Sequence, residues 1–340
     1  MEKLNLKDLS QSELEEYIIS LGEPKFRATQ IYKWLYSGIE HADEMTNISK
    51  KLRERIKTEC IISSVTIEKK FVSALDGTRR YLLKLADGNY VESVLMKYKH
   101  GYSICISSQV GCAMGCKFCA STRGGKIRNL TAGEIIDQII AVQGDIGERI
   151  SNVVMMGVGE PLDNFDNVVK FIENVNNPLG LNIGQRHITV STCGIVDRIY
   201  ELADLKLQIT LAISLHATDD KSRSEIMPIN RKYGIEKVLK ACKYYSEKTG
   251  RRLTFEYTLI RGVNDFKENA ENLAGILKGM LCHVNLIPVN AVEGTGFLPA
   301  NDNNIKNFVN ILDKRGVPTT VRREMGSDIS AACGQLRSKG

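Results

Sequence analysis

The sequence predicts an α/β fold, a partial (β/α)6 barrel with a small N-terminal helical module and an antiparallel β segment. Three observations predict it. The first 60 residues show helical periodicity, the next 40 alternate apolar and polar residues, and the rest alternates β-rich runs with helical stretches. A chain of 340 residues is long enough for a barrel with an appendage. We expect domain boundaries at 1–60, 61–100 and 101–340.

The N-terminal module is predicted to contain three short helices. Ser12 followed by Glu15 matches a capping box, and the apolar stretch that it opens stops at Gly22. A second helical stretch covers residues 24–38, and a third covers about 47–58. The third is rich in Lys and Arg, so we expect this module to bind RNA if the protein has a nucleic-acid partner.

The remaining periodicities predict the β structure. Asp76-Gly77 and Asp87-Gly88 are hairpin turn signals, so residues 61–100 should form an antiparallel meander. Beyond residue 101, helical stretches such as the one that opens at Thr131–Glu134 separate short β-rich runs, as in parallel β/α units. The runs lie at 102–107, 152–156, 187–191, 208–215, 254–260, 283–289 and 319–322.

Composition narrows the class of protein. Hydrophobic residues make up 43% and charged residues 25%, which is ordinary for a globular protein. No apolar stretch is long enough for a spanning helix, and the charged start does not resemble a signal peptide, so we expect a cytoplasmic location without a membrane partner. The net charge of +6 permits an anionic partner without demanding one. We expect a monomer.

Three of the nine cysteines form the strongest chemical signal. Cys112, Cys116 and Cys119 have the spacing Cys-x3-Cys-x2-Cys and follow the first parallel run, at the end of the barrel where active sites lie. Three thiolates suit an iron–sulfur cluster whose fourth iron stays open. Structural zinc is the alternative, but it needs a fourth donor, and Cys105 and His100 lie on the strand side of the loop.

Polar residues follow several of the other β-rich runs. Gly159 and Glu160 form a glycine turn with a carboxylate, which can accept hydrogen bonds from an ammonium group. Carboxyl ends of parallel strands converge at a barrel mouth, although any one of these residues alone would be taken for a strand-end cap. The other candidates are Ser191, Ser214, Leu215, His216 and Asn290.

The cysteine loop resembles that of the radical S-adenosylmethionine (SAM) enzymes, and four segments resemble the RlmN family of dual-specificity RNA methyltransferases. These segments are 107–116, 128–134, 227–231 and 327–336, and the resemblance spans essentially the whole chain. It implies a [4Fe-4S] cluster on the three cysteines, SAM bound at the strand-end residues, and a reducing electron donor of the flavodoxin type. It implies methylation of carbon 2 of an adenosine in 23S rRNA, at the peptidyl-transferase centre, and of the adenosine 3′ to the anticodon in certain tRNAs.

The resemblance also implies a covalent route with two SAM per turnover. Carbon 2 of adenine is electron-poor and cannot attack a sulfonium methyl group, whereas a carbon radical can add to it. One SAM methylates Cys333, and the 5′-deoxyadenosyl radical from the second activates that S-methyl group. Cys105 then releases the product by forming a disulfide with Cys333. Glu92 or the Cys105 thiolate takes the carbon 2 proton, and the sequence leaves both open.

Two alternatives and the RNA surface remain open. A Cfr-like enzyme, which methylates carbon 8 of the rRNA adenosine and confers antibiotic resistance, shares the cluster and both cysteines. A zinc-stabilised RNA-binding protein without catalysis is the alternative from another class. Residues 50–57 and 123–128 are the candidate RNA contacts among several basic segments. We expect four isolated cysteines to be structural, namely Cys60, Cys193, Cys242 and Cys282.

Overall fold

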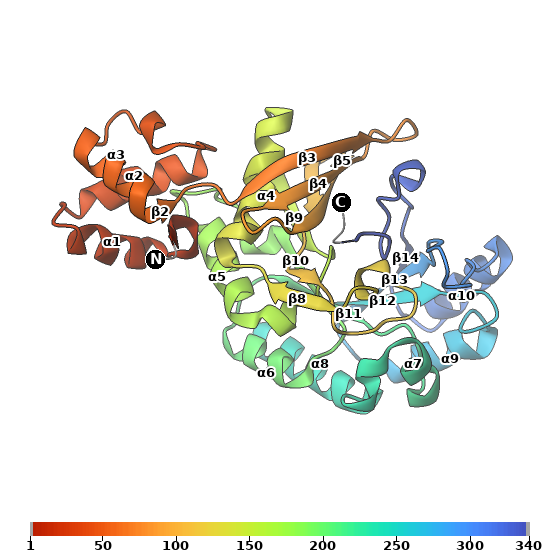
Figure 1. Ribbon diagram of the computed structural model, residues 1–340. Helices are drawn as coiled ribbons and strands as arrows, with labels where there is room; N and C mark the ends of the chain where they lie inside the picture. The colour runs from red at the N-terminus through yellow and green to blue at the C-terminus, as the bar shows by residue number, and fades with distance from the viewer. Residues whose placement is uncertain (1–2, 338–340) are drawn as a thin grey trace.

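The N-terminal module forms one end of the molecule in the computed structural model, which describes residues 3–337 (Figure 1). The three predicted helices are present, and two short parallel strands join the start of the module to its end. Their bounds are α1 (Gln11–Ser20), α2 (Phe26–Tyr36), α3 (Lys50–Glu59), β1 (Leu4–Asn5) and β2 (Cys60–Ile61).

The predicted capping box at Ser12 and Glu15 was wrong by two residues. Ser10 caps α1 instead, with its side chain accepting from the Glu13 N–H and the Glu13 carboxylate accepting from the Ser10 N–H. Both pairs have the same spacing, and the earlier start lengthens the helix. It also leaves Glu15 free to pair with Lys25.

Ten strands form one sheet in the order β14-β13-β12-β11-β10-β9-β6-β5-β4-β3. All seven predicted β-rich runs appear as neighbouring parallel strands, so the partial barrel is confirmed. These strands are β6 (Gly101–Cys105), β9 (Ile150–Met155), β10 (Ile188–Thr192), β11 (Thr210–Ser214), β12 (Leu253–Leu259), β13 (Cys282–Pro288) and β14 (Thr319–Val321).

The antiparallel meander is also confirmed, with left-handed glycines at both turns, Gly77 and Gly88. It continues into the barrel sheet, because β5 pairs with β6 along a register that sets Val94 opposite Cys105. The three-domain division therefore stays a prediction, with its second boundary inside one sheet. The meander strands are β3 (Val65–Val72), β4 (Arg79–Leu85) and β5 (Tyr90–Tyr98).

Helices cover the outer face of the parallel strands (Figure 1). Strand β12, for example, is buried along almost its whole length, as expected for a parallel strand covered on both faces. The inner face is left to line the barrel interior. The helices are α4 (Ala132–Ile146), α5 (Phe165–Asn176), α6 (Val196–Asp204), α7 (Asp220–Ile226), α8 (Ile235–Thr249), α9 (Lys267–Ile276) and α10 (Asp302–Lys314). Within residues 3–337, no helix has the length and apolar content needed to cross a bilayer.

A buried ion pair ties the N-terminal module to the barrel. Lys7 lies in the turn before α1, and its Nζ contacts Asp137 of α4 and donates to the carbonyl of Ile62. The second carboxylate oxygen of Asp137 accepts from the backbone and side chain of Ser64. Three segments that are distant in sequence thus meet at one pair of charges.

We expect Lys7→Met to lower the free energy of unfolding by about 3–5 kcal/mol, because it leaves the Asp137 carboxylate buried without a counter-charge. Urea denaturation followed by circular dichroism measures this change. The control is Lys25→Met, which breaks the exposed pair with Glu15 and should cost less than about 1 kcal/mol. Equal destabilisation by both variants would contradict the role given to the buried pair.

Candidate active site

The three motif cysteines lie in the loop of a β-hairpin. Short strands β7 (Gln109–Gly111) and β8 (Lys126–Asn129) pair antiparallel, and the loop between them carries Cys112, Cys116 and Cys119. Gly111 has φ +75°, and a Cβ there would lie 1.9 Å from the carbonyl oxygen of Gly125. Only glycine permits this closure, which explains the residue directly before the first cysteine.

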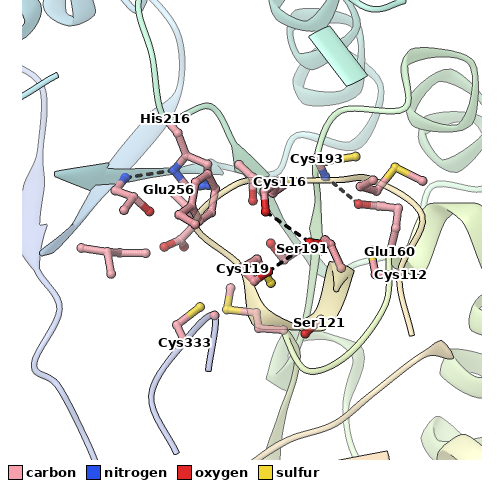
Figure 2. A pocket seen from close by; sticks show the side chains of 18 of the residues that line it. Cys112, Cys116, Cys119, Ser121, Glu160, Ser191, Cys193, His216, Glu256 and Cys333 are labelled. Carbon is pink, nitrogen blue, oxygen red and sulfur yellow. Dashed lines mark hydrogen bonds between the residues drawn. The ribbon is translucent and has the colours of Figure 1, made fainter. Parts of the chain in front are cut away.

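All three thiols line one cavity at the carboxyl ends of the parallel strands (Figure 2). The space within the cavity, including the part that is open to solvent, is about 990 Å³, which is enough for a small-molecule ligand. Burial raises the pKa of Cys112 to about 12, so this thiol is protonated until a metal displaces the proton.

The three cysteines fit a cluster better than a single ion. Zinc draws four donors to about 2.3 Å from one point, and no group of three His, Cys, Asp or Glu side chains in residues 3–337 converges in that way. A cuboidal iron–sulfur cluster binds each thiolate at a different iron, so its ligands stand further apart. The donor set is therefore suited to such a cluster with one iron left for another ligand.

The glycine turn after β9 places a carboxylate on the cavity wall. Gly159 has φ +111°, and a Cβ there would lie 2.7 Å from Ser108 Oγ. The turn therefore packs directly against the segment that contains Ser108. Glu160 Oε2 accepts from the N–H of Cys193 at 2.7 Å (Figure 2), and Oε1 accepts from the N–H of Leu162 at 3.0 Å. These bonds orient the carboxylate, and each oxygen keeps a lone pair for a ligand. Burial raises the pKa of Glu160.

The structure brings most of the strand-end candidates to the same cavity. Ser191, Ser214, His216 and Asn290 all line it, although their strands are spread across the sheet. Leu215 does not line it, because its side chain is fully buried in the core. A cofactor contact by Leu215 thus stays a prediction.

His216 is held as a neutral donor. Its Nδ1 accepts from the N–H of Thr258 at 2.9 Å, so the single proton of the neutral ring lies on Nε2. Burial, with the charge of Arg223, lowers the pKa of His216 to about 3. The residue has φ +57°, a left-handed conformation that marks functional sites more often than ordinary strand ends.

Sequence reasoning missed Glu256, which lies on β12 and lines the cavity (Figure 2). Its side chain is buried, and its Oε1 accepts from Asn285 Nδ2 at 2.9 Å. Its Oε2 has no hydrogen-bond partner among the described residues and lies 3.6 Å from Nη1 of Arg322. A glutamate between Phe255 and Tyr257 in a β-rich run was the available signal, since a buried charge requires a partner.

A second cavity adjoins the first, and Cys333 lines both. Cys105 lines the second cavity, so the structure brings the two predicted catalytic thiols to one space. Burial and the nearby Cys333 raise the pKa of Cys105 to about 12. In Figure 2, Cys333 lies across the first cavity from Cys112 and Glu160.

The C-terminal segment that carries Cys333 is docked by hydrogen bonds to the barrel mouth. Asn290 Nδ2 donates to the carbonyl of Cys333 at 2.8 Å, and the N–H of Ala120 donates to the carbonyl of Gly334 at 2.7 Å. Asn290 was predicted as a cofactor ligand, and here its amide holds the cysteine segment. The amide oxygen of Asn290 remains for a ligand.

Glu92 lines neither of these cavities. Its carboxylate accepts from Arg80 Nη1 at 2.7 Å and from the N–H of Arg337 at 2.7 Å, so it holds the C-terminal segment from the other side. Burial raises the pKa of Glu92. Of the cysteines expected to be structural, Cys193 reaches the first cavity and supports Glu160 through its backbone.

Comparison with known proteins matches this architecture. A family model for the radical SAM superfamily matches residues 106–274, and one for the ribosomal RNA large subunit methyltransferase N-terminal domain matches residues 4–62. A protein of Alkaliphilus oremlandii, named a probable dual-specificity RNA methyltransferase RlmN, is 56% identical and covers 100% of this chain and 99% of its own. A protein of Clostridium botulinum with the same name is 58% identical, and the match covers 98% of this chain and 96% of its own.

A solved structure agrees over nearly the whole chain. The crystal structure of a radical SAM methyltransferase from Sphaerobacter thermophilus has a TM-score of 0.95 and 44% sequence identity, and the match covers 99% of this chain and 100% of that one.

Proposed function

Because this chain belongs to the RlmN family of radical SAM dual-specificity RNA methyltransferases, we propose that it methylates carbon 2 of an adenosine in 23S rRNA, at the peptidyl-transferase centre, and in certain tRNAs, at the adenosine 3′ to the anticodon. The observation that carries the proposal is the position of Cys333, which lines both the cavity of the motif cysteines and the cavity that holds Cys105. A thiol in this place can take a methyl group from one side and deliver it to a base on the other.

The residues present fit both cofactors. Cys112, Cys116 and Cys119 would hold a [4Fe-4S] cluster, which supplies one electron to SAM and so permits radical chemistry at an electron-poor carbon. Glu160 would accept from the ammonium group of SAM, since its carboxylate is oriented and buried at the cavity wall. The remaining ligands would be Gly159, Ser191, Ser214, His216 and Asn290.

The two thiols of the second cavity carry the covalent steps. The Cys333 sulfur would accept a methyl group from one SAM, and that group would lose a hydrogen atom to the radical supplied by the second SAM. The resulting carbon would bond to carbon 2 of the base, and the adduct would lose the carbon 2 proton and one electron, which would return to the oxidised cluster. The Cys105 thiolate attacks the Cys333 sulfur, so an S–S bond forms while the carbon–sulfur bond breaks. The released carbon keeps the electron pair and takes a proton, and it becomes the new methyl group.

The proton on carbon 2 has two candidate acceptors. Cys105 lies in the cavity where the base would react, and it can take this proton only in its thiolate form. Glu92 does not line this cavity, and its two carboxylate oxygens already accept from Arg80 and from the N–H of Arg337. The docked arrangement therefore favours Cys105 for this step.

Identification of the methylated carbon tests the proposed function. The protein is reconstituted anaerobically with iron and sulfide, reduced by flavodoxin and incubated with SAM and RNA, and the digested RNA is examined by mass spectrometry. 2-Methyladenosine supports the proposal, and 8-methyladenosine would assign the chain to the Cfr-like activity. A preparation that holds one zinc ion and no sulfide would contradict both. Sedimentation of the same sample tests the expected monomer.

Glu256 provides a test of SAM binding. We expect Glu256→Gln to weaken SAM binding by about 10- to 100-fold, because a charged acceptor contributes about 1.5–3 kcal/mol to a hydrogen bond with the hydroxyl groups of the cofactor. Equilibrium dialysis of the cluster-loaded protein measures the dissociation constant. Glu148→Gln, at an exposed surface carboxylate, is the control. Unchanged SAM affinity in Glu256→Gln would remove this residue from the binding site.

A further inference from the structure

The mouth of the second cavity combines positive charge with exposed aromatic rings. Lys97 and Arg323 lie on its rim and are exposed, and neither forms an ion pair with any residue in 3–337. With Arg322 they outnumber Glu324, the single carboxylate among the described residues of the lining. The space within this cavity, including the part that is open to solvent, is about 1840 Å³, against about 990 Å³ for the first cavity.

The two segments predicted to contact RNA carry less free charge than their sequences indicate. Lys57 pairs with Asp43 and Glu54, and Arg55 pairs with Glu59. In the second segment, Lys126 pairs with Asp163, while Arg128 is held by Asp87 and Glu134. These carboxylates offset part of the positive charge that would otherwise contact phosphates. Lys97 and Arg323 at the cavity mouth have no such carboxylate partner within the range that the structure describes.

Tyr98 forms an aromatic platform at that mouth. Its ring is stacked on the ring of His100, with centroids 5.2 Å apart and an angle of 6° between the planes. Tyr98 is 40% exposed although it also lines the cavity. Both rings lie at the turn between β5 and β6. Tyr98 is seven residues before Cys105 in the sequence. An exposed stacked pair presents a flat apolar surface that any nucleobase can extend.

We propose that this mouth is where single-stranded RNA enters the active site: a base next to the reacting adenosine stacks on the Tyr98–His100 pair, and Lys97 and Arg323 contact the flanking phosphates. The inference rests on the proposed function, since it assumes that the substrate is RNA. It assigns the RNA contact to two other basic segments of the sequence, 97–100 and 322–323, in place of the preferred candidates 50–57 and 123–128. A flipped or unpaired adenosine inserted toward Cys105 and Cys333 must bring its neighbours to this rim, because the backbone on both sides of it leaves through the same opening.

Binding of a fluorescently labelled hairpin RNA, with the target adenosine in its loop, tests the inference. We expect Tyr98→Ala to raise the dissociation constant about 5- to 100-fold, which is the range for loss of one base–aromatic stack. Tyr98→Phe keeps the ring and should bind like the parent. Lys97→Ala and Arg323→Ala should each reduce the slope of log affinity against log salt by about 0.7–1. A 2-aminopurine next to the target should be quenched by the parent and not by Tyr98→Ala.

Controls come from the outer helices. Tyr244 on α8 also pairs with a second ring, that of Tyr200, at 5.0 Å, and Lys243 lies beside it. Tyr244→Ala and Lys243→Ala should leave RNA affinity and salt dependence unchanged. Cluster content and melting temperature of each variant show whether it is folded.

The outcomes separate the inference from the proposed function. If the parent methylates RNA and Tyr98→Ala binds RNA with equal affinity and equal quenching, the inference is wrong while the function stands. If Lys97→Ala and Arg323→Ala slow reduction by flavodoxin without changing RNA binding, the mouth docks the electron donor instead and the inference is wrong. If the parent neither binds nor methylates RNA, the proposed function fails and the inference fails with it.

Discussion

Replacing Cys333 with alanine is expected to abolish methyl transfer while the iron–sulfur cluster remains. The residue is the one cysteine that lines both cavities in the described part of the chain, so no other thiol is placed to receive a methyl group and present it to RNA. Loss of a covalent nucleophile lowers turnover by about a thousandfold or more in other enzymes. The measurement is methylated adenosine per enzyme, quantified by mass spectrometry after anaerobic incubation with SAM, reductant and RNA.

The control for this variant is Cys282→Ala, which removes a buried thiol at the start of β13, away from both cavities. Both variants should keep the parent's iron and sulfide content and its absorbance at about 400 nm. Retained methylation in Cys333→Ala would end the methyl-carrier role. Loss of cluster in Cys333→Ala would contradict the separation between Cys333 and the three cluster ligands.

Replacing Cys105 with alanine is expected to trap the enzyme on its RNA. Without this thiol, no attack on the Cys333 sulfur breaks its bond to the modified base, so each enzyme molecule stops after one covalent addition. A denaturing gel with labelled RNA should show a shifted band that approaches one RNA per enzyme. Multiple-turnover methylation should fall to background.

The double variant Cys105→Ala/Cys333→Ala is the matched control, since it lacks the sulfur that would carry the crosslink. It should give no shifted band. Free RNA with normal 2-methyladenosine from the Cys105→Ala enzyme would show that another group resolves the intermediate. If Cys105 is also the base, the trapped species should still carry the carbon 2 proton, because the variant lacks the group that would remove it.

Local sequence patterns were sufficient for the elements of the fold. Each parallel strand was predicted because a short β-rich run stands between helical stretches, and the hairpin turns because Asp-Gly pairs favour left-handed backbone. The capping box was misplaced because Ser10-x-x-Glu13 and Ser12-x-x-Glu15 have the same spacing. Local preference alone does not choose between them.

The site was predicted as far as its residues follow the strand ends. Ser191, Ser214, His216 and Asn290 meet at one cavity because parallel strands end on the same side of a sheet. Glu256 was not predicted because it lies inside a strand. Only the unpartnered, buried oxygen of its carboxylate identifies it as a candidate ligand. The pairing of Lys57 and Arg128 with carboxylates was equally invisible, since a basic segment looks the same whether or not acids cover it.

By itself the sequence determined the β/α order, the cysteine loop and the family, because each depends on spacing along the chain. Only the tertiary structure decided that Cys333 stands between two cavities, that Glu92 holds the C-terminal segment, and that Lys97, Arg323 and an aromatic pair border the second cavity. These features depend on residues as far apart in the sequence as Tyr98 and Arg323, which line the same cavity. Such contacts form when the sheet closes and the chain end packs against it, and no local pattern records which distant side chains then become neighbours.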